Sequence, residues 1–175
     1  MIKFFLILFS ISLHSQSTFN RSEWSVWKTY QGCISVREKV LIDYSLKPVI
    51  YDVKKCSVVS GEWKTLWENK TFFYSKDLDI DHTVPLSWTW THGADKWTKK
   101  MKEDYANNDK SKYYLLPLSI KANRTKGDRG PDEWLPEANR CLYITTFENI
   151  VNENKLNLTD KEKIKYEELK RNECK

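Results

Sequence analysis

The chain has 175 residues, of which 40% are hydrophobic and 30% are charged, and its formal net charge at pH 7 is +5. This length suits one domain, since domains commonly contain about 100–200 residues. After residue 17 no segment is apolar enough to cross a bilayer, which needs about 20 such residues, so the composition excludes a multi-span membrane protein. The mild basic excess suits a polyanionic partner.

Residues 1–17 have the pattern of a signal peptide. Lys3 supplies a positive start, residues 4–13 form a short apolar run, and small residues at 15–17 offer a cleavage point. We expect cleavage and export to the periplasm or the medium. The mature chain is then residues 18–175, or 158 residues (175 minus 17), with a net charge of +4 once Lys3 is lost. An uncleaved membrane anchor is the alternative.

Four cysteines remain in the mature chain, namely Cys33, Cys56, Cys141 and Cys174. An even count after a signal peptide favours disulfides, because exported proteins mature in an oxidising compartment. Three pairings are possible, and we favour Cys33–Cys56 with Cys141–Cys174 because each pair closes a local loop at one end of the domain. A structural zinc site is the alternative, although no Cys-x-x-Cys pair is present.

The spacing of apolar residues predicts one α+β domain with a few short strands and flanking helices. Residues 19–31 and 35–44 have helical spacing, and residues 48–74 alternate as expected for a small antiparallel hairpin region. The remaining predicted elements are a strand from 78, a short helix from Pro85, a helix over 96–106, a strand over 113–117, and helices over 119–126, 137–151 and 159–174. Thr159 and Glu162 form a capping box at the start of the last helix.

Two polar stretches carry the candidate chemistry. Asp81 and His82 are adjacent at the end of a predicted strand, and Pro85 can open a helix after them. Residues 121–130 place Asn123 inside a dense basic cluster. A carboxylate and an amide are oxygen ligands for a hard cation, and a neutral imidazole can take a proton from water. Together these groups indicate metal-assisted cleavage of a phosphodiester, with His92 as the rival base.

These stretches resemble the HNH endonucleases, also called the ββα-metal or His-Me finger superfamily, and in particular their small secreted branch. That branch has Asp-His-x-Val-Pro-Leu, then Ala-Asn-Arg-x-Lys-Gly-Asp-Arg, then Glu-Trp-Leu-Pro, and this chain has all three in the same order. The matching residues are Asp81–Leu86, Ala122–Arg129 and Glu133–Pro136, together with Gly32-Cys33, Arg37, Val40-Leu41, Gly61, Trp63, Trp90, Gly93-Ala94, Trp97 and Leu115-Leu116. The likeness spans most of the mature chain.

The resemblance implies a disulfide-stapled domain with a ββα-metal core at about residues 78–127, and it assigns roles to single positions. His82 matches the general base. Asp81 and Asn123 match the ligands of one divalent ion, expected to be Mg²⁺, with Mn²⁺ or Ca²⁺ as alternatives. The expected contacts to nucleic-acid phosphates are Arg37, Arg124, Lys126 and Arg129. One position departs from the pattern, because Tyr114 stands where the family has the middle Asn that braces the loop of the His. Asn107 and Asn108 lie a few residues earlier, as if the loop had gained residues.

The sequence therefore predicts a secreted, monomeric endonuclease that cleaves DNA, with RNA as a second candidate substrate. We expect low sequence specificity because no recognition module is appended. Two other classes stay open. One is a secreted binder of nucleic acid or polyanions that lacks catalysis, which Tyr114 favours, and the other is a disulfide-stapled structural or adhesion protein. Metal dependence separates the enzyme from the binder, and loss of DNA binding in high salt separates the binder from the structural protein.

Overall fold

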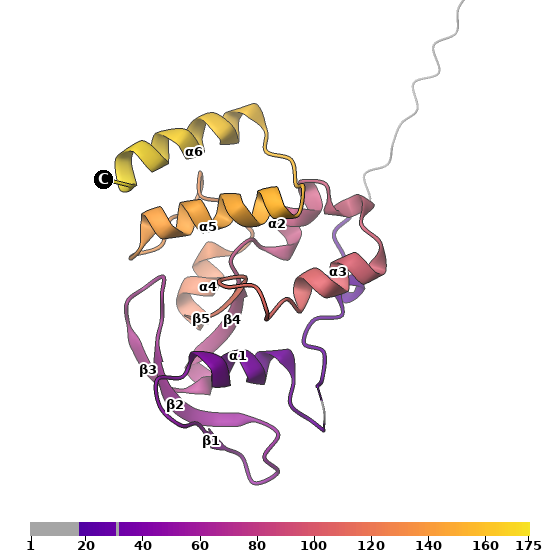
Figure 1. The fold of residues 1–175 in the computed structure, drawn as a ribbon, viewed down its shortest axis with the longest axis vertical. Helices are drawn as coiled ribbons and strands as arrows, with labels where there is room; N and C mark the ends of the chain where they lie inside the picture. The colour runs from indigo at the N-terminus through magenta and orange to yellow at the C-terminus, as the bar shows by residue number, and fades with distance from the viewer. Residues whose placement is uncertain (1–17, 31) are drawn as a thin grey trace, which may run out of the picture.

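The computed structural model describes residues 18–30 and 32–175, so the predicted signal peptide lies outside the described residues. The described chain is a mixed α+β domain with two disulfides. Among these residues no helix combines the length and the apolar character needed to cross a membrane. Along the long axis of the molecule, a three-stranded sheet lies at one end and a pair of helices at the other, with a two-stranded sheet between them (Figure 1).

The N-terminal part forms the first end of the domain. After the turn η1 (Arg21–Trp24), which packs against residues 99–106 away from this end, its elements are α1 (Val36–Tyr44), β1 (Ile50–Tyr51), β2 (Val58–Lys64) and β3 (Thr71–Tyr74). The strands pair antiparallel in the order β1-β2-β3, as the alternation over residues 48–74 predicts. Ser35 caps α1 by accepting a hydrogen bond from the Glu38 amide. The indole of Trp63 on β2 donates to the Leu41 carbonyl on α1 at 2.7 Å, which joins helix and sheet.

A second sheet and a helix make the centre of the molecule. After η2 (Ser75–Asp77), β4 (Leu78–His82) pairs antiparallel with β5 (Leu115–Ser119), and α4 (Ile120–Lys126) follows β5 directly. The chain between the two strands forms α2 (Leu86–Thr91), η3 (Ala94–Lys96) and α3 (Lys99–Ala106). All five residues of β5 are buried, so this hairpin lies in the core. Ser119 caps α4, and Gly127 ends it with a φ of +59°, as predicted.

Two long helices, α5 (Arg140–Glu153) and α6 (Asp160–Glu173), form the other end. They pack against each other, and the predicted capping box of Thr159 and Glu162 is present at the start of α6. Phe147 and Tyr166 meet edge to face between them, with ring centroids 5.9 Å apart. The apolar faces of α5 and α6 therefore continue the core that begins around β4 and β5.

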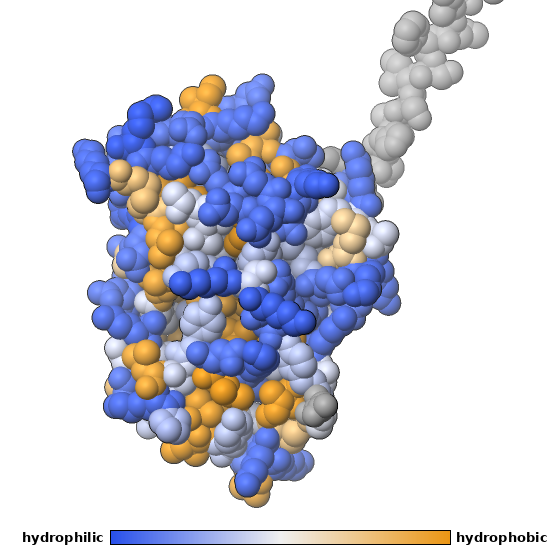
Figure 2. Space-filling model, viewed as in Figure 1, coloured by the Kyte–Doolittle hydropathy of each residue, from blue (hydrophilic) through white to orange (hydrophobic). Residues whose placement is uncertain are grey.

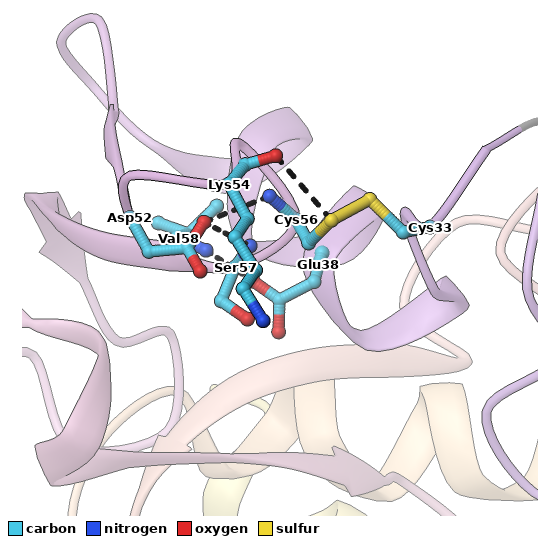
Figure 3. The surroundings of a disulfide bond; sticks show 7 residues. All are labelled: Cys33, Glu38, Asp52, Lys54, Cys56, Ser57 and Val58. Atoms are coloured by element: carbon cyan, nitrogen blue, oxygen red, sulfur yellow. Dashed lines mark hydrogen bonds between the residues drawn. A yellow bond between two sulfur atoms is a disulfide. The ribbon is translucent and has the colours of Figure 1, made fainter.

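The two disulfides have the local pairing expected from the sequence. Cys33–Cys56 joins the segment before α1 to the loop between β1 and β2 (Figure 3), and Cys141–Cys174 joins the first turn of α5 to the end of α6. Beside the first disulfide, Asp52 accepts hydrogen bonds from the Cys56 and Ser57 amides. Each crosslink thus holds one end of the domain.

The surface is mainly hydrophilic on the face drawn in Figure 2, where apolar side chains gather towards the end that carries the three-stranded sheet. Ile50, Val53 and Val59, in this sheet and its first loop, are exposed. Two short differences from the sequence prediction lie elsewhere. In the described part of residues 19–31 the helical spacing yields the single turn η1, and the helix expected over 96–106 begins at Lys99, because Lys96 ends the turn η3.

Candidate functional site

Asp81 and His82 end the strand β4, and their side chains leave it on opposite faces. Neighbouring residues of a strand alternate in direction, and the contacts agree with this. Asp81 reaches α4, whereas His82 reaches the end of α3 and the indole ring of Trp27. Their strand partners on β5 are Leu116 and Leu115. His82, the predicted base, and Asp81, the predicted carboxylate ligand, therefore contact different neighbouring residues.

Asp81 forms a buried ion pair with Lys126. The Lys126 ammonium donates to the two carboxylate oxygens of Asp81 at 2.7 and 2.6 Å and to the His82 carbonyl at 2.6 Å. The side chain of Lys126 is fully buried and that of Asp81 is 5% exposed. Burial raises the pKa of the Asp81 carboxyl and lowers the pKa of the Lys126 ammonium, and in each case the charge of the partner opposes that effect. The pair is a cation held by three oxygens.

Asn123 lies on the same side of β4 but contacts another carboxylate. Its amide nitrogen donates to Asp79 at 3.0 Å. Asp79 precedes Asp81 by two residues, so both carboxylates project from the same face of the strand towards α4. Asn123 and Lys126 are three residues apart on α4, which brings them to neighbouring positions of that helix. The helix thus offers an amide to Asp79 and an ammonium to Asp81, and Asp81 and Asn123 do not share a contact among the described residues.

The imidazole of His82 is held in one protonation state. Its Nε2 lies 2.9 Å from the Ala106 carbonyl, and because a carbonyl can only accept, Nε2 must carry the proton and Nδ1 the lone pair. Burial lowers the pKa of His82 to about 3, and the charges of Arg21 and Lys126 add to this effect. The ring is therefore neutral at physiological pH. Trp27 stacks on it with ring centroids 5.5 Å apart and an interplanar angle of 20°.

The four predicted phosphate contacts have different surroundings. Arg124 is exposed, whereas Lys126 is fully buried against Asp81 and does not lie on the surface. Arg37 donates to the Glu38 carboxylate at 2.7 Å and also to the carbonyls of Ser75 and Leu78, and its side chain is 29% exposed. Arg129 donates through Nε to the Lys126 carbonyl at 3.0 Å. Only Arg124 thus presents its charge to solvent without a hydrogen bond among the described residues.

Tyr114, at the position of the middle Asn, points away from the candidate site. Its hydroxyl donates to Glu153 and accepts from Asn154, each at 2.7 Å, on α5 and just after it. Its carbonyl accepts from the Thr83 amide at 3.0 Å, one residue beyond His82. The loop that follows His82 is therefore tied by the backbone of this position and not by its side chain.

His92, the rival base, belongs to a joint between α2 and α6. Its Nδ1 lies 2.6 Å from the Trp88 carbonyl and its Nε2 lies 2.9 Å from Glu162. Its ring stacks on Trp88 at a centroid distance of 3.5 Å. Nε2 thus joins the end of α2 to α6, whereas Nδ1 stays within the last turn of α2, so the contacts of the ring are those of a structural residue.

The sequence prediction did not include three residues that the structure brings to this site. Asp79 could have been found from the period of two along the strand, which places it beside Asp81. The sequence places Asn107 a few residues before Tyr114, but it gives no sign of the contacts of Asn107 and Trp27, because these span 79 positions (107 minus 28) and 55 positions (82 minus 27). A cavity of about 880 Å³ lies between α3 and residues 28–30, and the predicted residues Asp81, His82 and Asn123 are not among those that line it.

The side chains around Asp81 determine which groups could bind a metal ion at this site. Among the residues that the structure describes, no three His, Cys, Asp or Glu side chains form a group that could hold a metal ion. Any ion here would depend on Asp79, Asp81 and the amide oxygen of Asn123, which are hard oxygen donors of the kind that Mg²⁺ prefers. In the structure the carboxylate of Asp81 already binds a cation, the Lys126 ammonium, and Asp79 accepts a hydrogen bond from the amide nitrogen of Asn123.

No family model matches the chain, and no solved structure matches it. The chain is similar to a protein of Arthroderma benhamiae described as an uncharacterized secreted protein. The two are 31% identical over 150 residues, which cover 85% of this chain and 72% of that protein. The chain belongs to the same family as this secreted protein.

Proposed function

We propose that this protein is a secreted, metal-dependent endonuclease that hydrolyses phosphodiester bonds in DNA with low sequence specificity. His82 acts as the general base and Asp81 and Asn123 hold one divalent ion. The observation that carries this proposal is the geometry of His82, whose Nε2 lies 2.9 Å from the Ala106 carbonyl, so that the neutral ring carries its lone pair on Nδ1. A histidine needs this state to take a proton from water.

The order of elements also supports the proposal. The strand β4 ends in Asp81-His82, the strand β5 pairs with it, and the helix α4 carries Asn123. This is the succession of a ββα-metal core that the resemblance implies. The signal-peptide pattern, the two disulfides and the description of the relative as secreted support export of this chain.

The residues of the chain define what each part does in hydrolysis. His82 Nδ1 accepts the proton of the attacking water, and the Ala106 carbonyl stabilises the ring as it becomes an imidazolium, because Nε2–H then donates to it more strongly. Arg124 binds a flanking phosphate from the surface of α4. The ion, when bound, neutralises charge on the phosphate and on the leaving oxygen. An ion held by Asp81 would have to share the carboxylate with the Lys126 ammonium or take the place of that ammonium.

One observation favours the second candidate, a nucleic-acid binder without catalysis. Both carboxylate oxygens of Asp81 are already occupied by the buried Lys126 ammonium. A protein that keeps this pair closed would bind nucleic acid through surface cations such as Arg124 and would cleave nothing. Its affinity would fall with salt and would not depend on a divalent ion.

The experiment that tests the proposal is plasmid nicking by the purified protein with Mg²⁺ and with EDTA. His82→Ala is the test variant and His92→Gln is the matched control, since His92 lies in a structural joint. We expect nicking that requires Mg²⁺, is lost in His82→Ala and persists in His92→Gln. Absence of cleavage of DNA and RNA with every divalent ion tried, together with salt-sensitive DNA binding, would leave the binder. Cleavage that survives His82→Ala would move the base elsewhere.

A further inference from the structure

The segment Ser25–Lys28 is held against the end of α3 by a single side chain, that of Asn107. Its oxygen accepts from the Lys28 amide at 2.8 Å. Its nitrogen donates to the Ser25 carbonyl at 3.0 Å and to the Glu103 carbonyl at 2.8 Å. Asn107 therefore grips both ends of a four-residue segment and fixes that segment to the last turn of the helix.

This segment has an unfavourable backbone. Ser25 has a φ of +43° and Trp27 a φ of +63°. Residues with a Cβ rarely adopt the left-handed region, and the conformation persists only where the surroundings impose it. Two of the three hydrogen bonds of Asn107 are such a constraint, because they bind the Ser25 carbonyl and the Lys28 amide on either side of Trp27, and the third ties Asn107 to Glu103 on α3.

The strained conformation of this segment places the Trp27 ring on the imidazole of His82. The two rings are nearly parallel, with an interplanar angle of 20°. Trp27 lies between the two backbone groups that Asn107 binds. The other contact of the imidazole, the Ala106 carbonyl, lies one residue before Asn107. The side chain of Asn107 thus binds the segment that carries Trp27, and its backbone follows Ala106, so Asn107 is next to both groups that contact the His82 ring.

We propose that Asn107 is a positioning residue for His82. It fixes Trp27 over one face of the imidazole and holds the end of α3 so that the Ala106 carbonyl receives Nε2–H, which leaves Nδ1 as the basic atom. Its importance for catalysis rests on the proposed function, but its effect on the ring does not. The rival role for Asn107 is a simple cap of α3 through the Glu103 carbonyl, which would leave His82 unchanged when removed.

The test compares Asn107→Ala and Asn107→Asp with the matched control Asn108→Ala. Asn108 is the next residue and its side chain contacts only Ser111 among the described residues. Aspartate keeps the acceptor for the Lys28 amide and loses both donors, so its effect should be intermediate. The first readout is the rate at which diethyl pyrocarbonate modifies His82, measured by mass spectrometry, with His92 in the same protein as internal reference. The second readout is the NMR shift of the His82 ring protons, which the Trp27 ring current displaces.

We expect the modification of His82 to become about tenfold faster in Asn107→Ala, which corresponds to a free-energy cost of exposing the ring that is about 1.4 kcal/mol lower. The ring-current shift of His82 should be lost, and the modification rate of His92 should not change. Asn108→Ala should match the wild type. If nicking is observed, kcat should fall on the order of 10- to 100-fold in Asn107→Ala with little change in KM, because a misplaced base affects the chemical step. Folded Asn107→Ala with unaltered reactivity and ring shift of His82 would overturn the proposal, whether or not the protein is a nuclease.

A second pair of variants keeps the test decisive if Asn107→Ala does not fold. Trp27→Ala removes the stacked ring and Trp27→Phe retains an aromatic face. We expect Trp27→Ala to expose His82 to the reagent and Trp27→Phe to restore protection. Equal reactivity of His82 in both variants and in the wild type would show that the segment held by Asn107 does not position the ring.

Discussion

Replacement of Lys126 by methionine tests the central contact of the candidate site. Methionine nearly conserves the volume of the side chain, so little of the loss comes from a cavity. The ammonium makes hydrogen bonds of 2.6–2.7 Å to both oxygens of Asp81 and to the His82 carbonyl, and it is fully buried. Removing one partner of such a pair leaves a buried charge without compensation, which costs about 3–5 kcal/mol. That loss is a large part of a typical total stability of about 5–15 kcal/mol.

Urea unfolding at pH 7 measures this loss. The series is the wild type, Lys126→Met, Asp81→Asn and the double variant, with Lys121→Met as control because Lys121 is exposed on the same helix. The double variant should lose less than the sum of the single variants, by about 1–3 kcal/mol, since it removes both buried charges. The control should change by less than about 0.5 kcal/mol. If Lys126→Met costs less than about 1 kcal/mol, the ammonium does not compensate Asp81 in solution and the reasoning fails.

Three further outcomes follow from other contacts. Burial lowers the pKa of His82 to about 3 in the folded protein, so below pH 6.5 the unfolded chain binds a proton that the folded ring does not bind. The free energy of unfolding should therefore fall between pH 6.5 and 3, by up to about 4 kcal/mol. Urea unfolding of His82→Gln should show a flatter pH dependence than the wild type, and an identical slope would contradict this. The Cys141→Ser/Cys174→Ser variant opens a loop of 33 residues. Because the open chain has more conformational entropy when unfolded, its free energy of unfolding, measured by heat or urea, should be about 4 kcal/mol lower. A loss below about 1 kcal/mol would count against this entropic explanation. Arg37→Leu removes hydrogen bonds to Glu38, Ser75 and Leu78 and should cost about 1–3 kcal/mol of stability. Arg124→Leu should leave stability unchanged and reduce the slope of log K for DNA binding against log salt concentration by about 1. The opposite pattern would make Arg37 the phosphate contact.

Much of the local structure could be predicted because the relevant signals are short-range. Ser35, Ser119 and the Thr159–Glu162 box mark helix starts through contacts within three residues of the chain. The alternation over residues 48–74 indicates paired strands, and the run that ends at His82 indicates the strand β4. The spacing of the cysteines favours local pairs, because nearby residues close the smaller loops. Each of these features depends on geometry that the chain defines within a few turns.

Only the tertiary structure decided which groups meet at the candidate site. The sequence places Asn123 and Lys126 one helical turn apart and Asp79 and Asp81 on one strand face, but which carboxylate receives which partner depends on how α4 packs on β4. The packing brings the ammonium to Asp81 and the amide to Asp79. It also determines that Lys126 is buried, that Trp27 stacks on His82, and that Asn107 binds the segment that carries Trp27. These contacts are long-range, so no periodicity or spacing along the chain encodes them.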